Sequence, residues 1–101
     1  MVYIQEPEFQ IVHTGNTVRY HCSGRSLDAE ALYIKWDKEG GQLPPGRSVD
    51  DTHGLLIIRD VKVSDSGIYI CQISDGVNIG IKKVTLTVGG VNPVEPRVVI
   101  S

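Results

Sequence analysis

The sequence predicts an all-β protein, and two observations support this prediction. Short segments of alternating apolar and polar residues recur roughly every eight to twelve residues, with Gly, Pro, Asn or Asp between them. No apolar pattern with the 3.6-residue period of a helix persists, and Val and Ile are plentiful while Ala is scarce. The chain of 101 residues has room for one hydrophobic core.

Five segments carry the strand pattern: 17–23, 32–37, 55–58, 67–74 and 83–88. In a strand, alternate side chains point to opposite faces, so each segment has a predicted inward set. The inward residues are Val18, Tyr20, Cys22, Leu32, Ile34, Trp36, Leu56, Ile58, Tyr69, Cys71, Ile73, Val84, Leu86 and Val88. Residues Leu55 and Ile57 are predicted to point outward, because Leu56 and Ile58 are in register with the apolar Val61.

Turn residues mark the connections and the limits of the domain. Residues 75–78 (Asp-Gly-Val-Asn) predict a tight hairpin, because Gly and Asn tolerate positive φ. The Gly- and Pro-rich residues 40–46 predict a loop with at most a short edge strand. We expect the domain at residues 5–88, an N-terminal extension at 1–4, and at 89–101 a linker that could hold the first strand of a following module. Its apolar residues Val98, Val99 and Ile100 predict a strand that adds to a sheet edge of this domain or of another copy.

Charge and composition argue against several functions. A net charge of −2 without a Lys/Arg cluster argues against nucleic-acid binding. No apolar segment reaches the roughly 18 residues of a membrane span, so membrane insertion is not expected. The three histidines, His13, His21 and His53, fall on separate segments, and no metal or other cofactor is predicted. Ser66 beside Asp65 has no histidine placed to act as its base, and we predict no enzyme activity and no catalytic residue.

Two cysteines stand 49 residues apart, which is too far for a zinc site of the paired type. A disulfide between Cys22 and Cys71 is the better interpretation, and a loop of that length is worth about 4 kcal/mol in the chain-entropy model. The alternative is a pair of buried free thiols, as an intracellular module would keep them.

Three features together carry a family resemblance. Trp36 follows Cys22 by 14 residues, and Cys71 ends the segment Asp65-Ser66-Gly67-Ile68-Tyr69-Ile70-Cys71. With the flanking residues 15–22 and 56–61, this pattern resembles the immunoglobulin superfamily from about residue 5 to 88. The resemblance implies an immunoglobulin-like sandwich with Greek-key connections, in which Trp36 packs on the disulfide and the Tyr69 hydroxyl bonds to the preceding corner. The short interval between the cysteines is similar to the I-set type.

The resemblance also assigns structural roles near that corner. In similar domains an arginine at the start of a short strand pairs with the aspartate that opens the corner, which predicts a bridge from Arg47 to Asp65 next to Gly67. The segments 40–45, 54–58 and 64–67 are similar to the repeated immunoglobulin modules of perlecan-type basement-membrane proteoglycans. Titin-like muscle modules and cell-adhesion receptors share most of this framework.

Outward positions on the last two strands and on the strand containing Trp36 are less polar than usual. The candidate protein-binding face consists of Tyr33, Lys35, Ile68, Ile70, Ile79 and Ile81. The alternative is that the Lys35 and Lys83 side chains cover these isoleucines. On the opposite sheet, a weak basic stripe of Arg19, His21, Ile57 and Arg59 is a candidate for binding heparan sulfate.

The sequence therefore predicts a non-catalytic interaction or spacer module of a secreted, multidomain matrix protein, most similar to basement-membrane proteoglycans. Its expected partners are extracellular proteins, neighbouring modules or a second copy. The alternatives are an intracellular titin-like module and a cell-adhesion ectodomain. The redox state of the cysteines separates the intracellular from the extracellular interpretation.

Overall fold

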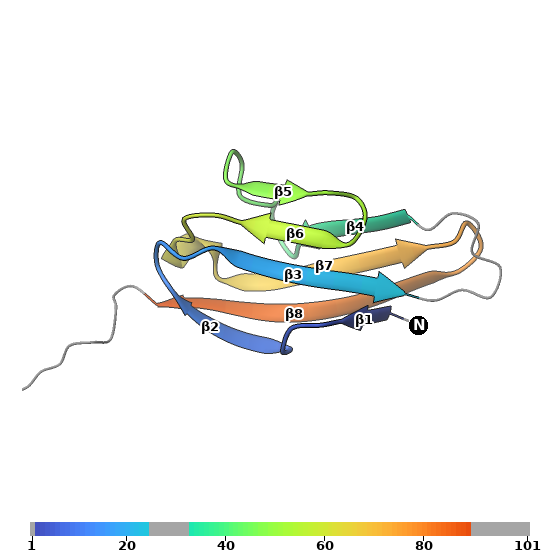
Figure 1. Cartoon of the computed structure of the whole chain (residues 1–101), viewed down its shortest axis with the longest axis horizontal. Helices are drawn as coiled ribbons and strands as arrows, with labels where there is room; N and C mark the ends of the chain where they lie inside the picture. The colour runs from blue at the N-terminus through green and yellow to red at the C-terminus, as the bar shows by residue number, and fades with distance from the viewer. Residues whose placement is uncertain (1, 25–32, 90–101) are drawn as a thin grey trace, which may run out of the picture.

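The computed structural model describes residues 2–24 and 33–89 of the chain. Two four-stranded sheets pack face to face, with strand orders β1-β3-β6-β5 and β2-β8-β7-β4 (Figure 1). This confirms the predicted all-β sandwich. The strands are β1 (Val2–Ile4), β2 (Phe9–His13), β3 (Val18–Gly24), β4 (Tyr33–Lys38), β5 (Ser48–Asp50), β6 (Leu55–Ile58), β7 (Gly67–Ser74) and β8 (Ile79–Gly89). A short 3-10 helix at Val63–Asp65 precedes β7.

The hydrophobic core lies between the sheets, and the parity predicted for the strands is confirmed there. The buried members of the predicted inward set are Val18, Tyr20, Cys22, Trp36, Leu56, Ile58, Tyr69, Cys71, Ile73, Val84, Leu86 and Val88. Ile34 is only half-buried and packs against the rim of this core. Leu32 lies outside the described residues.

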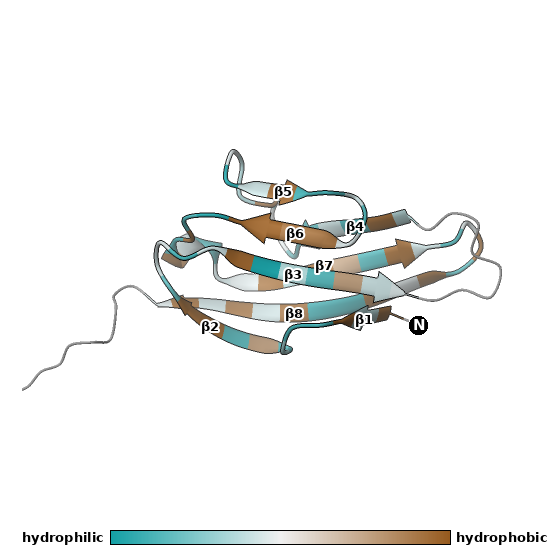
Figure 2. Ribbon diagram, in the orientation of Figure 1, coloured by the Kyte–Doolittle hydropathy of each residue, from teal (hydrophilic) through white to brown (hydrophobic). Residues whose placement is uncertain are grey.

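The strand β6 is apolar along its whole length, and Figure 2 shows it brown from end to end. Leu55 and Ile57 have the outward parity predicted for them, yet both are half-buried. β6 lies between β3 and β5, which places Arg19 and Val49 on either side of Ile57. A central strand shelters its outer side chains in this way, so an apolar residue is tolerated there.

The N-terminal segment crosses from one sheet to the other. β1 pairs with β3 in an antiparallel ladder, whereas β2 pairs with β8 in a parallel one. Ile4 is buried in the core, so the sheet begins before the boundary expected at residue 5, and Val2–Ile4 is a strand of the domain. Pro7 lies between the two strands and cannot donate a ladder hydrogen bond. Neither segment was among the five strands predicted from the sequence.

The connections follow the predicted turn chemistry with one correction. The Asp75 N–H donates to the Asn78 carbonyl at 3.2 Å, and Gly76 has a φ of 93°. Asn78 does not adopt positive φ, contrary to the reason we assigned to it. Instead, the Asp75 carboxylate accepts hydrogen bonds from the Val77 and Asn78 N–H groups at 2.8 and 2.7 Å. The Gly- and Pro-rich segment leads into β5, the short edge strand. The strand predicted at Val98–Ile100 lies outside the described residues.

Candidate functional site

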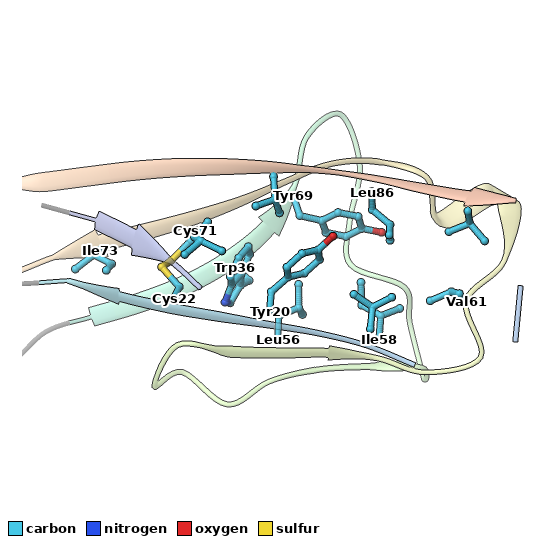
Figure 3. Packing of buried hydrophobic residues seen from close by; sticks show 14 residues of the cluster. Tyr20, Cys22, Trp36, Leu56, Ile58, Val61, Tyr69, Cys71, Ile73 and Leu86 are labelled. Atoms are coloured by element: carbon cyan, nitrogen blue, oxygen red, sulfur yellow. A yellow bond between two sulfur atoms is a disulfide. The ribbon is translucent and has the colours of Figure 1, made fainter. Parts of the chain in front are cut away.

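A disulfide and a tryptophan join the two sheets at the centre of the core. Cys22 on β3 and Cys71 on β7 are bonded, with their Cα atoms 6.6 Å apart. Trp36 on β4 is the register partner of Cys71, and Figure 3 shows its ring beside the disulfide. The Tyr20 ring stacks on Trp36 with 5.7 Å between the centroids. The structure thus brings together the three residues on which the family resemblance rests.

Gly54 supports this cluster, and in the sequence it appeared only as the first residue of the segment 54–58. Its carbonyl accepts hydrogen bonds from the Trp36 indole N–H at 3.0 Å and from the Cys22 N–H at 2.8 Å. Gly54 has a φ of 113°, and a Cβ atom there would lie 2.1 Å from the Cys22 carbonyl oxygen. Only glycine fits such a position. A glycine just before an apolar strand was the signal available in the sequence.

An ion pair holds the corner before β7. The Arg47 guanidinium donates to both carboxylate oxygens of Asp65 at 2.8 Å. The Lys62 N–H donates to the same carboxylate at 2.8 Å, and Asp65 is buried. Hydrogen bonding from Arg47 holds the pKa of Asp65 below its ordinary value, despite burial. The pair joins the residue before β5 to the corner, as the family resemblance predicted.

Tyr69 completes the corner. Its hydroxyl donates to the Asp65 carbonyl at 2.6 Å, and burial raises its pKa to about 12. Gly67 is the first residue of β7. The Lys38 side chain lies against Gly67 and over the Tyr69 ring, with its Nζ atom 5.7 Å from the ring centroid. The Tyr20 hydroxyl has no hydrogen-bond partner within the described residues, and burial raises its pKa. These residues hold the fold together.

We expect Asp65→Asn to lower the free energy of unfolding at pH 7 by about 3 kcal/mol, because it removes one member of a largely buried pair. Since the folded-state pKa of Asp65 is lowered, the stabilisation is complete above the unfolded-state pKa of about 3.9 and is lost as the pH falls below it. Urea unfolding between pH 7 and 2.5 measures this. The difference in the free energy of unfolding between wild type and variant should become smaller below about pH 4.

The exposed carboxylate of Asp37 offers a matched control. Asp37→Asn should leave the free energy of unfolding unchanged within about 0.5 kcal/mol. If the free-energy difference between wild type and Asp65→Asn stays constant down to pH 2.5, the role assigned to the Asp65 charge is wrong.

The candidate protein-binding face lies on the outer surface of β4, β7 and β8. Tyr33, Ile79 and Ile81 are 70%, 64% and 55% exposed, and Lys35 is exposed beside them. In the register, the row of Tyr33, Ser74 and Ile79 is followed by the row of Lys35, Gln72 and Ile81. The exposed apolar members of these rows, Tyr33, Ile79 and Ile81, thus share one face at the end of the sheet that carries the 75–78 hairpin.

Ile68 and Ile70 lie nearer the middle of the same face and are half-buried. Lys83 is the register partner of Ile70, and its Nζ atom pairs with Glu39 at 3.0 Å. The four isoleucines therefore do not form one evenly exposed patch. Lys83 thus lies beside Ile70, whereas Ile79 lies at the far end of the same ladder.

Sequence reasoning missed two exposed apolar residues on this sheet. Phe9 and Ile11 on β2 are 72% and 76% exposed and pair with Thr85 and Thr87 of β8, on the outer face. Their alternation with Gln10 was visible in the sequence. The face to which they belong was not, because it follows from the parallel pairing of β2 with β8.

The basic stripe on the opposite sheet is weaker than its sequence suggests. Arg19 and Arg59 are exposed, but the Glu6 carboxylate accepts the His21 N–H at 2.6 Å and lies 2.6 Å from His21 Nδ1. This acidic group offsets positive charge where a sulfated sugar would bind, and Ile57 is half-buried. Within residues 2–24 and 33–89, no three His, Cys, Asp or Glu side chains converge as metal ligands. The helical part of the described chain contains no segment capable of spanning a membrane.

Comparison with known proteins identifies the family. A family model described as an immunoglobulin domain matches residues 2–75. The chain belongs to the immunoglobulin family. Among curated relatives, the basement membrane-specific heparan sulfate proteoglycan core protein of Mus musculus is 38% identical over 65% of this chain. The basement membrane proteoglycan of Caenorhabditis elegans is 34% identical over 88% of it. The chain covers only 2% and 3% of these two proteins.

Solved immunoglobulin structures superpose well on this domain. Extracellular domains 3–5 of Drosophila OTK match with a TM-score of 0.67 and 26% identity, over 87% of this chain and 31% of that one. The M1 domain of titin matches with a TM-score of 0.65 and 22% identity, over 83% and 91% of the two chains. The titin match supports the fold alone.

Proposed function

We propose that this immunoglobulin domain is a non-catalytic interaction module of an extracellular multidomain protein of the basement membrane, binding protein partners through the outer face of β4, β7 and β8. The observation that carries the proposal is the group of exposed apolar residues Tyr33, Ile79 and Ile81 on one sheet face. Apolar residues gathered on one exposed surface are typical of protein contacts. The similarity to proteoglycan core proteins supports the location.

The disulfide favours this extracellular assignment over the titin-like alternative. A bond between Cys22 and Cys71 persists in an oxidising compartment and is rare in the cytosol. The lack of a strand at residues 39–47, where variable-type domains add two, supports the I-set type. A cell-adhesion ectodomain is the second candidate, since the neuronal cell adhesion molecule of Mus musculus is 31% identical over 67% of this chain.

Tyr33→Lys combined with Ile70→Thr should abolish partner binding while moving the thermal midpoint by less than about 4 °C, the shift that roughly 1 kcal/mol produces in a domain of this size. Tyr33 is exposed and Ile70 half-buried on the proposed face, so the variant changes the surface and leaves the core in place. Immobilised wild type and variant are incubated with solubilised basement-membrane proteins. Retained proteins are quantified by mass spectrometry.

Val49→Lys is the matched control, because Val49 is an exposed apolar residue on the other sheet. It should retain the same proteins as wild type. Equal retention by all three forms would contradict the proposed face. Retention of nothing by wild type would overturn the interaction role and leave the module as a spacer.

A further inference from the structure

About half of one edge of the β2-β8-β7-β4 sheet has no partner strand among the residues that the structure describes. β2 pairs with β8 only from Thr85 to Gly89, while β7 occupies the other side of β8 from Ile79 to Leu86. Within the described residues, no strand pairs with β8 between Ile79 and Val84 on the β2 side. An unpaired strand edge presents main-chain donors and acceptors that another strand can bind.

The hydrogen bonds of β2 reveal which peptide groups point to this edge. The Thr85 N–H donates to the Glu8 carbonyl at 2.7 Å, and the Gly89 carbonyl accepts from the Thr14 N–H at 3.1 Å. Peptide groups alternate in direction along a strand, so those of Ile79, Ile81 and Lys83 point the same way as those of Thr85 and Gly89. The free edge therefore offers three N–H and three C=O groups.

β1 passes close to this edge without pairing to it. It belongs to the other sheet, where it pairs with β3, and the Val2 side chain lies against the inner side of Gly80. β1 therefore covers the core beneath β8 and leaves the main-chain edge of Ile79–Lys83 free. Two strongly exposed side chains, Ile79 and Ile81, belong to the same edge.

We propose that a second copy of this chain occupies the free edge, with the two Ile79–Lys83 segments paired in an antiparallel ladder about a twofold axis at Ile81. Edge-facing residues must lie opposite each other to exchange hydrogen bonds. With Ile81 opposite Ile81 and Ile79 opposite Lys83, all three edge-facing residues of each copy are bonded. The closed twofold arrangement uses the same surface on both copies.

Charge and side-chain size select this register over its neighbours. A shift that centres the axis on Lys82 or Lys83 places two lysines directly opposite each other, which is unfavourable. A shift toward Gly80 leaves Lys83 without a strand partner and reduces the number of main-chain bonds. In the proposed register, each Lys82 lies opposite Gly80, which has no side chain to collide with it.

Cysteine scanning tests the register in the full chain. Residues opposite each other in a bonded pair have Cα atoms about 5.5 Å apart, within reach of a disulfide. Ile81→Cys should therefore form a covalent dimer under mild oxidation. Ile79→Cys and Lys83→Cys should each remain monomeric, because four residues, about 13 Å, separate each new cysteine from its copy. A mixture of the latter two should cross-link to each other.

Non-reducing electrophoresis and intact mass measure the cross-linking, and Thr87→Cys is the control. Thr87 is exposed on the same strand but lies where β2 occupies the edge, so it should stay monomeric. The native Cys22–Cys71 bond is buried and should not exchange. Equal cross-linking of Ile79→Cys and Ile81→Cys, or none by Ile81→Cys, would overturn the proposed register.

Ile81→Pro tests the edge itself. It removes one edge N–H without removing a hydrogen bond to β7, since the Ile81 peptide points away from that strand. Sedimentation should show a wild-type dimer whose dissociation constant rises at least tenfold in the variant. A wild type that is monomeric up to about 1 mM, the limit of weak association, would overturn the proposal. Tyr33→Lys with Ile70→Thr leaves the edge intact, so failure of partner binding and failure of edge pairing are separate results.

Discussion

Trp36→Ala is expected to lower the free energy of unfolding by about 3–5 kcal/mol, because it leaves a cavity beside the disulfide. The Trp36 side chain is fully buried, stacks on Tyr20 and donates to the Gly54 carbonyl. Removing it takes away dispersion contacts from both sheets at once. Urea unfolding at pH 7, followed by tyrosine fluorescence or circular dichroism, measures the change.

Two further variants separate the causes of that loss. Tyr33→Ala removes an exposed ring from the same strand and should cost less than about 0.5 kcal/mol. Trp36→Phe keeps an aromatic ring but loses the hydrogen bond to Gly54. Its loss in free energy of unfolding should therefore lie between those of Tyr33→Ala and Trp36→Ala. A cost below about 1 kcal/mol for Trp36→Ala would mean that the tryptophan does not fill the core as described.

Replacing both cysteines by alanine should destabilise the domain by about 4 kcal/mol, the chain-entropy cost of releasing a 49-residue loop. The effect arises mainly in the unfolded state, which gains freedom when Cys22 and Cys71 are no longer linked. Because small domains have roughly 5–15 kcal/mol of stability, the double variant should be close to unfolding at 37 °C. Guanidinium unfolding with the midpoint and slope both fitted gives the measurement.

Wild type with its disulfide reduced is the matched comparison, because it loses the same link without losing the sulfur atoms. Both forms should unfold at a similar denaturant concentration. A double variant within about 1 kcal/mol of the oxidised wild type would show that the link does not supply the unfolded-state entropy term assigned to it.

The strand period allowed much of the core to be predicted from sequence. The inward residues of β3, β7 and the second half of β8 could be predicted from alternation. A register shift of one residue would place Arg19 or Lys83 in the core. The cysteine and tryptophan positions then defined which strands face each other. The Arg47–Asp65 pair required the comparison with related domains, since nothing in the spacing of these residues reveals their contact.

Other features depend on contacts between segments far apart in the chain. The parallel pairing of β2 with β8 joins residues more than 70 positions apart, and it determines where Phe9 and Ile11 point. The close approach of Gly54 to Cys22 and the bonding of Glu6 to His21 arise only when β6 and the N-terminal segment pack on β3. Because the N-terminal segment crosses between the sheets, β2 pairs with β8 only from Thr85 onward, and among the described residues no strand pairs with the Ile79–Lys83 edge. Local residue preferences could not predict this, because strand pairing partners are selected by the packing of the whole sandwich.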